Sequence, residues 1–177
     1  LAHYGVLFLD EFPEFRKDTL EALRQPIEDG FVTITRASAR STYPAQFMLV
    51  AAMNPCPCGN YGSRITPCRC TAQQIQRYRN RISGPMLDRI DIHVEMGEVG
   101  YNDIAGRSRG EPSSAIRARV NAARAIQTRR YAGMGILFNA QLTNRMMNQY
   151  CVLTSDAESL MKKAFASLKL SARAYTR

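Results

Sequence analysis

The order of apolar and polar residues predicts two buried strands in the first third of the chain. Gly5–Leu9 is a continuous apolar run, which is typical of a strand covered on both faces in a parallel sheet. Ala45–Met53 is a second β-rich run of the same character. The first run ends at Asp10 and Glu11 and the second at Asn54, so each predicted strand delivers polar side chains at its carboxyl end.

Apolar residues recur at helical spacing in two stretches, one between these strands and one after them. From about Arg16 apolar residues recur every three or four positions, and Pro26 is expected to bend or end this helix before Gly30. Gln73–Ile82 shows the same spacing, and a short helical turn is expected after it. A third strand is predicted over Ile90–Glu95.

A β-hairpin, or a strand pair with a basic tip, is predicted after the first helix, and the beginning of the second strand is its second arm. Phe31–Thr35 and Ala45–Val50 are β-rich runs on either side of a short polar tip, residues 36–42. This tip carries Arg36 and Arg40, and Tyr43 follows it. Positive charge and an aromatic ring on an exposed tip are suited to contact nucleic acid, and a solvated hairpin end is the alternative.

The remainder of the chain predicts a linker and a helical region. Residues 97–112 hold four glycines and several charges with few apolar side chains, as expected for a linker. From Ser113 onward apolar residues recur at helical spacing through several helices. The sequence thus predicts an α/β fold, with a three-layer αβα part and a parallel sheet over residues 1–96, followed by an α-helical part over residues 113–177.

Composition and charge narrow the class of protein. The 177 residues are 45% hydrophobic and 22% charged, which excludes collagen-like and wholly disordered chains. A net charge of +9 leaves both a nucleic-acid partner and a merely basic soluble surface open. No apolar run approaches the roughly 20 residues of a membrane span. The chain shows no secretory leader, so we expect a cytoplasmic location with reduced thiols.

Four of the five cysteines form a close group. Cys56 and Cys58 make one C-x-C pair, and Cys68 and Cys70 make a second pair after nine intervening residues. Two such pairs supply the four thiolates of a closed structural Zn²⁺ site, although C-x-C gives a tighter bite than C-x-x-C. Reduced thiols without metal, or redox chemistry, are the alternatives. Cys151 stands alone and is expected to be a small buried residue.

The acidic end of the first strand has the chemistry of a nucleotide-hydrolysing site. In a Walker B motif an aspartate holds Mg²⁺ through water and the adjacent carboxylate polarises the attacking water, which are the roles open to Asp10 and Glu11. The amide of Asn54, at the end of the second strand, is suited to hydrogen-bond the γ-phosphate or that water. An acidic strand end that only caps the following helix is the alternative.

Four segments of the chain read, in order, GVLFLDEFPEF, EALRQPIEDG, FMLVAAMNPCPCG and ISGPMLDRIDIHV. In this order they resemble the magnesium-chelatase-like AAA+ ATPases, most closely the bacterial ComM/YifB branch. The resemblance covers nearly the whole chain, down to LSARAYTR at its end. It implies that the α/β part is a partial AAA+ core and that the helical part is its lid.

The resemblance also implies roles for single residues. Asp10 and Glu11 correspond to the Walker B pair, and Asn54 corresponds to sensor 1. Arg89 resembles the arginine finger that reaches the γ-phosphate of a neighbouring subunit, and Arg173 resembles the sensor-2 arginine of the lid. The implied cofactors are ATP and Mg²⁺, and the implied assembly is a homo-oligomeric ring, expected to be a hexamer. For both arginines an ordinary surface position or a structural ion pair is the alternative.

The function that the resemblance implies is ATP-driven work on DNA. Proteins of the ComM type are motors that promote branch migration during recombination in transformation, and the excess of arginine agrees with DNA as the partner. A magnesium-chelatase motor subunit, which drives Mg²⁺ insertion into a porphyrin, is one alternative, and the cysteine group speaks against it. A zinc-stabilised nucleic-acid-binding module without catalysis is another, and it leaves Asp10, Asn54 and Arg89 without a role.

One departure from the family pattern is large. No G-x-x-x-x-G-K-[ST] phosphate loop occurs in the sequence, so this chain by itself is expected neither to bind ATP well nor to hydrolyse it. In the family, the strand that leads to this loop lies between the sensor-1 strand and the strand expected at Ile90–Glu95. We therefore expect unpaired sheet edges and an isolated chain that oligomerises, exchanges elements or is poorly ordered.

Overall fold

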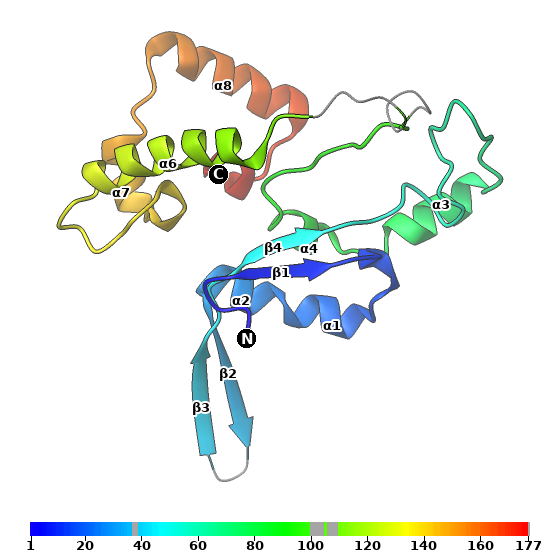
Figure 1. Cartoon of the computed structure of the whole chain (residues 1–177), viewed down its shortest axis with the longest axis horizontal. Coiled ribbons are helices and arrows are strands. Elements are labelled where there is room, and N and C mark those ends of the chain that lie inside the picture. Colours follow the sequence, from blue (N-terminus) through cyan, green and yellow to red (C-terminus); the bar gives the residue numbers. More distant parts are fainter. Residues whose placement is uncertain (37–38, 100–104, 106–109, 177) are drawn as a thin grey trace. The chain divides into compact units, whose positions relative to one another are not determined.

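The computed structural model describes residues 1–36, 39–99, 105 and 110–176, and it divides into two compact units. The first unit is Leu1–Glu98 together with Ser171–Arg177, and the second is Val99–Leu170. The first unit holds all the strands that the structure describes, and the second is helical (Figure 1). The predicted α/β fold with a helical region is confirmed. Much of the predicted linker 97–112 lies outside the described residues.

The first unit is built on a parallel pair of strands, β1 (Val6–Leu9) and β4 (Met48–Ala51). Their register pairs Val6 with Met48 and Leu9 with Ala51, so the two strands begin and end together. Only one face of this sheet is covered, because Val6 and Phe8 are each 58% exposed. The prediction that the first strand is buried on both faces is therefore wrong for the chain as described.

Two short helices return the chain along the sheet. After β1 come the 3₁₀ turn η1 (Phe12–Glu14), α1 (Lys17–Ala22) and α2 (Arg24–Asp29). The break between the helices has a local cause, because the ring of Pro26 clashes with the carbonyl four residues earlier, which is that of Ala22. Gly30 ends α2 with φ of 73°, a left-handed conformation that favours glycine, and its N–H donates to the Pro26 carbonyl over 3.0 Å.

The end of α2 lies beside the amino ends of both strands. The carbonyl of Gly30 accepts the N–H of Ala45 over 2.7 Å, three residues before β4 begins. The N–H of Tyr4, two residues before β1, donates to the carbonyl of Gln46 over 2.6 Å. Residues at the end of α2 therefore sit at the sheet edge opposite to the one where the strands terminate.

A hairpin forms, but with a different second strand from the one predicted. It pairs β2 (Phe31–Arg36) with β3 (Ala39–Pro44) in antiparallel register. Residues 39–42, which the sequence suggests as part of a polar tip, belong to β3, and Met48–Ala51 pairs with β1 instead. Because β3 is solvated on both faces, its residues carry no apolar alternation that would announce a strand. Figure 1 shows the hairpin extending away from the β1–β4 sheet.

Two further helices of the first unit each begin at a side-chain cap. Thr71 and Gln74 form a capping box at the start of α3 (Ala72–Arg79), and the Ser83 hydroxyl accepts the Met86 N–H at the start of α4 (Gly84–Leu87). The third strand predicted at Ile90–Glu95 is not formed. This segment has no strand beside it among the described residues, and Ile92 is 79% exposed. A strand needs a hydrogen-bonded neighbour, whatever its side-chain pattern.

The core of the first unit lies between the covered sheet face and the helices. Its buried members are Phe12, Leu20, Ile82 and Met86. Leu9 of β1 and Leu49 of β4 pack against them from the sheet. The core thus joins α1 to the α3–α4 segment, and it holds the residues after β1 in place.

The second unit is helical. It contains α6 (Ser113–Arg130), η2 (Asn139–Gln141), α7 (Asn144–Tyr150) and α8 (Ser155–Leu168). Tyr131 is buried, stacks edge-on against Tyr150 and donates to the Asn139 side chain over 2.8 Å. Cys151, predicted to be buried, is exposed, and it is the residue that caps the end of α7.

The short helix α9 (Ala172–Thr176) follows the second unit in the chain but groups with the first. Among the helices of the described ranges, none combines the length and the apolar character that crossing a bilayer requires.

Truncating the core should destabilise the first unit. Met86 is fully buried, so Met86→Ala is expected to lower the free energy of unfolding by about 2–5 kcal/mol, since it removes buried contacts and leaves a cavity. Met96, in the same unit, is 87% exposed, and Met96→Ala is the matched control, with an expected change below about 0.5 kcal/mol. Urea unfolding followed by circular dichroism measures both. Equal effects of the two substitutions would contradict this core.

Candidate functional site

The two polar strand ends meet at one edge of the sheet. The parallel pairing continues past the strands, because Ala52 donates to the Leu9 carbonyl and Phe12 donates to the Ala52 carbonyl, each over 2.9 Å. Asp10 and Asn54 therefore both follow the carboxyl ends of adjacent strands. In open α/β sheets this edge is where ligands bind.

Glu11 is held in an unusual backbone conformation. Its φ and ψ are 49° and 43°, in the left-handed region that a residue with a side chain seldom adopts. Its N–H donates to Asp10 Oδ1 over 2.9 Å, which orients the aspartate. Within the described ranges the second Asp10 oxygen and the Glu11 carboxylate make no hydrogen bond or ion pair. Backbone strain of this kind is concentrated at functional sites. The side chains of Asp10 and Glu11 are both exposed to solvent.

Helix α3 anchors the backbone around Asn54. The buried Tyr78 hydroxyl is joined to the Asn54 backbone by a hydrogen bond, and burial raises the pKa of this hydroxyl. Arg79 Nε donates to the Pro55 carbonyl over 3.4 Å, and the Arg79 guanidinium lies 5.0 Å from the centre of the Tyr61 ring. The backbone at Asn54 is thus held by α3 and by the loop that leads into α3.

The two arginines with implied phosphate roles lie together, away from Asp10 and Asn54. Arg89 follows α4, and its Nε donates to Glu28 Oε2 over 3.1 Å. Arg173 of α9 donates from Nη1 to the other oxygen of the same carboxylate over 2.9 Å. Glu28 is near the end of α2, at the amino edge of the sheet. One chain therefore does not bring Arg89 or Arg173 to the edge that holds Asp10.

Sequence reasoning missed Glu28. The hydrogen bonds from both arginines lower the pKa of its carboxyl, that from Arg89 most strongly. The only sequence signal was a carboxylate at the end of a helix, inside the segment EALRQPIEDG, and this gives no indication of a partner 145 positions away.

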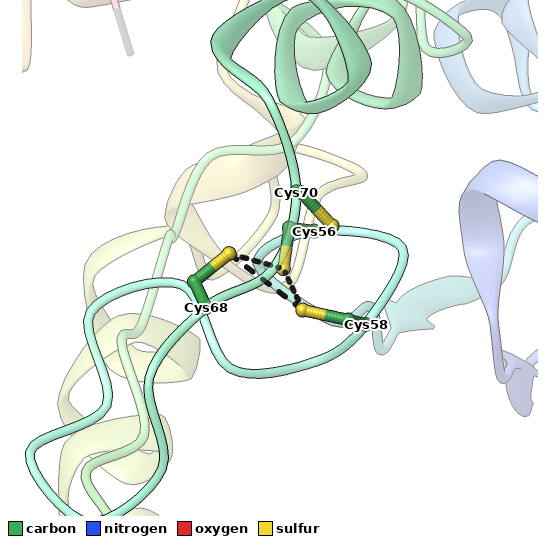
Figure 2. Close-up of side chains that lie close together, drawn as sticks. All are labelled: Cys56, Cys58, Cys68 and Cys70. Carbon is green, nitrogen blue, oxygen red and sulfur yellow. Dashed lines mark hydrogen bonds between the residues drawn. The ribbon is translucent and has the colours of Figure 1, made fainter.

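The four clustered cysteines meet as the spacing predicts. Figure 2 shows their side chains gathered in the loop between β4 and α3, and Cys56 is the buried member of the four. The Sγ atoms of Cys56, Cys58 and Cys68 are 3.4–3.7 Å apart, and all four lie within 4.8 Å of one another. A tetrahedral Zn²⁺ with bonds of about 2.3 Å needs sulfurs about 3.8 Å apart, so this donor set fits the ion. The same spacing is far too long for a disulfide.

The thiols of this cluster differ in acidity. Backbone N–H groups of Asn60 and Arg69 lower the pKa of Cys58 to about 6, so this thiol ionises at neutral pH. Burial, followed by the neighbouring thiols, raises the pKa of Cys70 to about 12. The raised pKa values of Cys68 and Cys70 keep these two thiols protonated at neutral pH, and a cation at the centre of the cluster would allow all four thiols to ionise.

The hairpin arginines face opposite ways. Arg36 pairs across the hairpin with Ala39, and Arg40 pairs with Thr35, so the two side chains lie on opposite faces of the ribbon. Tyr43, paired with Val32, shares the face of Arg36. Both arginines are exposed, and across the described residues neither has an ion-pair partner. The hairpin therefore carries one cation on each side and cannot direct both at one phosphate.

Comparison with known proteins identifies the family. The model of magnesium chelatase, subunit ChlI, matches residues 1–104, and that of its C-terminal region matches residues 110–177. The chain belongs to this magnesium-chelatase family. Within it the chain falls in the ComM/YifB branch, because it is 45% identical over 178 residues to the competence protein ComM of Haemophilus influenzae and 44% identical over 178 residues to the uncharacterized protein YifB of Salmonella typhimurium.

Each of these alignments covers the whole chain but only 34% of the relative, so the chain spans about a third of the length of these relatives. An uncharacterized protein of Mycobacterium tuberculosis, Rv2897c, is 39% identical over 148 residues, which is 84% of this chain. The family suggests the use of ATP and Mg²⁺.

Zn²⁺ binding by the cysteine cluster can be tested directly. Chain purified with reduced thiols is expected to hold about one equivalent of Zn²⁺, measured by elemental analysis. Cys56→Ser and Cys70→Ser should each lose it, whereas Cys151→Ser, which removes an exposed thiol outside the cluster, should retain it. Because protons compete with the metal for the thiolates, acidification should weaken binding. Wild-type chain with less than about a tenth of an equivalent would contradict the metal centre.

Proposed function

We propose that this chain is part of a AAA+ ATPase motor that works on DNA. The observation that carries the proposal is the parallel pairing of β1 with β4, because it brings the residues that follow the two strands, Asp10 and Glu11 after β1 and Asn54 after β4, to one sheet edge. Two carboxylates and an amide are among the groups that take part in the hydrolysis of a terminal phosphate, and the phosphate loop, which this chain does not contain, is another. The strained backbone of Glu11 supports the same interpretation.

Each of these residues has a definite task in the proposed site. Asp10 would hold Mg²⁺ through water, and the metal supplies neutralisation of phosphate charge. Glu11 accepts a proton from the attacking water, and its carboxylate is free of internal partners within the described part of the chain. Asn54 donates from its amide to the phosphate or orients that water. Its backbone is fixed by Tyr78, so the amide is positioned before the nucleotide arrives.

The complete site is proposed to form between two copies of the protein. Arg89 and Arg173 are held at the amino edge of the sheet, and Asp10 and Glu11 are held at the carboxyl edge. A neighbouring copy that brings its arginines to this carboxyl edge would supply the positive charge that stabilises the transition state. Head-to-tail contacts of this kind close into a ring, for which we propose six copies.

DNA is the proposed partner of the motor. One relative is named a competence protein, which supports a role in DNA uptake and recombination. The exposed hairpin with a cation on each face, and the net charge of +9, suit contact with a phosphate backbone. We therefore propose DNA remodelling, specifically branch migration during transformation, in the cytoplasm. The cysteine cluster is proposed to hold a structural Zn²⁺ that stiffens the loop after Asn54.

Glu11 should be required for turnover in the full-length protein. Glu11→Gln is expected to lower DNA-stimulated ATP hydrolysis by roughly a hundredfold, since the general base is lost. Glu14→Gln is the matched control: Glu14 only pairs with Arg81 on the surface, at 2.5 Å, so its loss should change turnover less than twofold. Wild-type turnover in Glu11→Gln would refute the role of Glu11, and a wild type that binds zinc and DNA without hydrolysing ATP would favour the non-catalytic module.

Mixed rings test whether two copies share the site. Glu11→Gln and Arg89→Ala are each expected to be inactive alone, yet a mixture in equal parts should recover about a quarter of wild-type turnover, because a quarter of random contacts combine an intact Glu11 with an intact Arg89. Mixing Arg89→Ala with Arg173→Ala should recover nothing, since both arginines come from the same copy. Equal recovery in the two mixtures would contradict this arrangement.

The hairpin arginines should contribute to DNA affinity through phosphate contacts. Replacing Arg36 and Arg40 by Ala together is expected to weaken binding to all DNA sequences and to reduce the slope of log affinity against log salt by about 2. The control removes two exposed charges elsewhere, by Arg145→Ala with Lys163→Ala, and should leave the slope nearly unchanged. Fluorescence anisotropy at several salt concentrations measures both. An unchanged slope in the hairpin variant would contradict the contact.

A further inference from the structure

Three charged side chains from distant parts of the chain meet at the amino edge of the sheet. Each oxygen of the Glu28 carboxylate accepts from a different arginine: Oε2 from Nε and Nη2 of Arg89, and Oε1 from Nη1 of Arg173. Arg89 and Arg173 expose only 14% and 21% of their side chains, and Glu28 exposes 45%. The carboxylate is thus the common partner of two largely covered guanidinium groups.

Glu28 offsets a repulsion that would otherwise separate the arginines. Two guanidinium groups that are both shielded from water repel more strongly than two on an open surface, because less solvent screens them. A carboxylate that bonds to both reduces the local charge from +2 to +1, and it fixes the direction of each group through hydrogen bonds. Without Glu28, we expect the two side chains to move apart.

Both guanidinium groups keep donors that Glu28 does not use. Arg89 also donates from Nη1 to the Pro85 carbonyl over 2.6 Å, which fixes its plane. Nε and Nη2 of Arg173 are buried and have no hydrogen-bond partner in the described ranges. This is the edge of a guanidinium whose two parallel N–H groups receive two oxygens of a phosphate or carboxylate. Buried donors without a partner are costly, so this edge of Arg173 favours an anionic ligand once the side chains that cover it move aside.

The backbone that carries the arginines is anchored independently of Glu28. The Ser171 hydroxyl, just before α9, donates to Asp88 Oδ1 over 3.4 Å, and Asp88 is the residue before Arg89. The Ser171 hydroxyl also accepts the N–H of Ala174. Replacing Glu28 should therefore alter where the guanidinium groups point and leave α9 next to the turn after α4.

We infer that Glu28 is a positioning residue, which holds Arg89 and Arg173 side by side so that both are presented to one phosphate. The inference rests on the proposed function, because it assigns that phosphate to the nucleotide of a neighbouring copy. Glu28 itself touches no reacting atom in this arrangement. Its effect on turnover must then pass entirely through the two arginines.

The test compares two adjacent carboxylates in the full-length protein. Glu28→Gln removes the charge and one acceptor, and it is expected to lower the kcat for ATP roughly tenfold to a hundredfold with little change in KM, since the misplaced arginines act in the transition state. Asp29→Asn makes the same change of charge one residue on, at an exposed side chain that is neither hydrogen-bonded nor ion-paired in the described part of the chain. It should leave kcat within about twofold.

A double-mutant cycle separates positioning from mere stability. In a background with Arg89 and Arg173 both replaced by Lys, which keeps the charge and a reduced but measurable kcat without the guanidinium fork, Glu28→Gln should change kcat by less than about twofold, because no guanidinium group remains to be positioned. Glu28→Asp is a second variant: it keeps the charge, and its shorter side chain does not reach both guanidinium groups, so a similar loss of kcat is expected. The thermal midpoint of each variant verifies that the protein is folded.

The outcomes distinguish this inference from the function on which it rests. If Arg89→Ala and Arg173→Ala abolish turnover while Glu28→Gln and Glu28→Asp do not reduce it, the positioning role is overturned and the proposed ATPase stands. If Glu28→Gln lowers kcat by the same factor with and without the arginines, its effect does not pass through them, and the role is again overturned. If neither arginine affects turnover, both proposals fail.

Discussion

The parallel pairing of β1 with β4 is the constraint on which the rest of the first unit depends. Two neighbouring strands that run the same way cannot be joined by a tight turn, so the chain must cross back over the sheet before the second strand begins. The segment from η1 through the β2–β3 hairpin provides this crossover. The same pairing brings the carboxyl ends of both strands to one edge, and it is the reason that Asp10 and Asn54 both lie at that edge.

The crossover also decides where the cationic groups lie. Because α1 and α2 run back along the sheet and end at Gly30, Glu28 reaches the amino edge, and Arg89 and Arg173 bond to it there. A single chain therefore presents acidic and amide groups at one edge and a pair of arginines at the other. Two such surfaces complement each other only between copies, which gives the proposed ring a physical basis in the fold of one unit.

The failures at Gly5–Leu9 and Ile90–Glu95 share one cause. The pattern at Ile90–Glu95 is that of a strand, and the run at Gly5–Leu9 is that of a strand covered on two faces, yet the first has no strand beside it in the described part of the chain and the second is covered on one face only. Side-chain patterns report the surroundings that a segment is suited to, and hydrogen-bonded neighbours must supply those surroundings. Strand β3 was not predicted because both of its faces are solvated, so its residues show no alternation of apolar and polar side chains.

The sequence by itself determined the local features: the positions of most helices, the helix break that Pro26 causes before it, the end at Gly30, the polar strand ends and the convergence of four closely spaced cysteines. These depend on residues within a few positions of one another, or on a short loop that closes easily. Only the tertiary structure decided that Arg89 and Arg173 share Glu28, that they lie away from Asp10, and that Arg36 and Arg40 face opposite ways. Those facts depend on strand register and on contacts between distant segments, which no local pattern encodes.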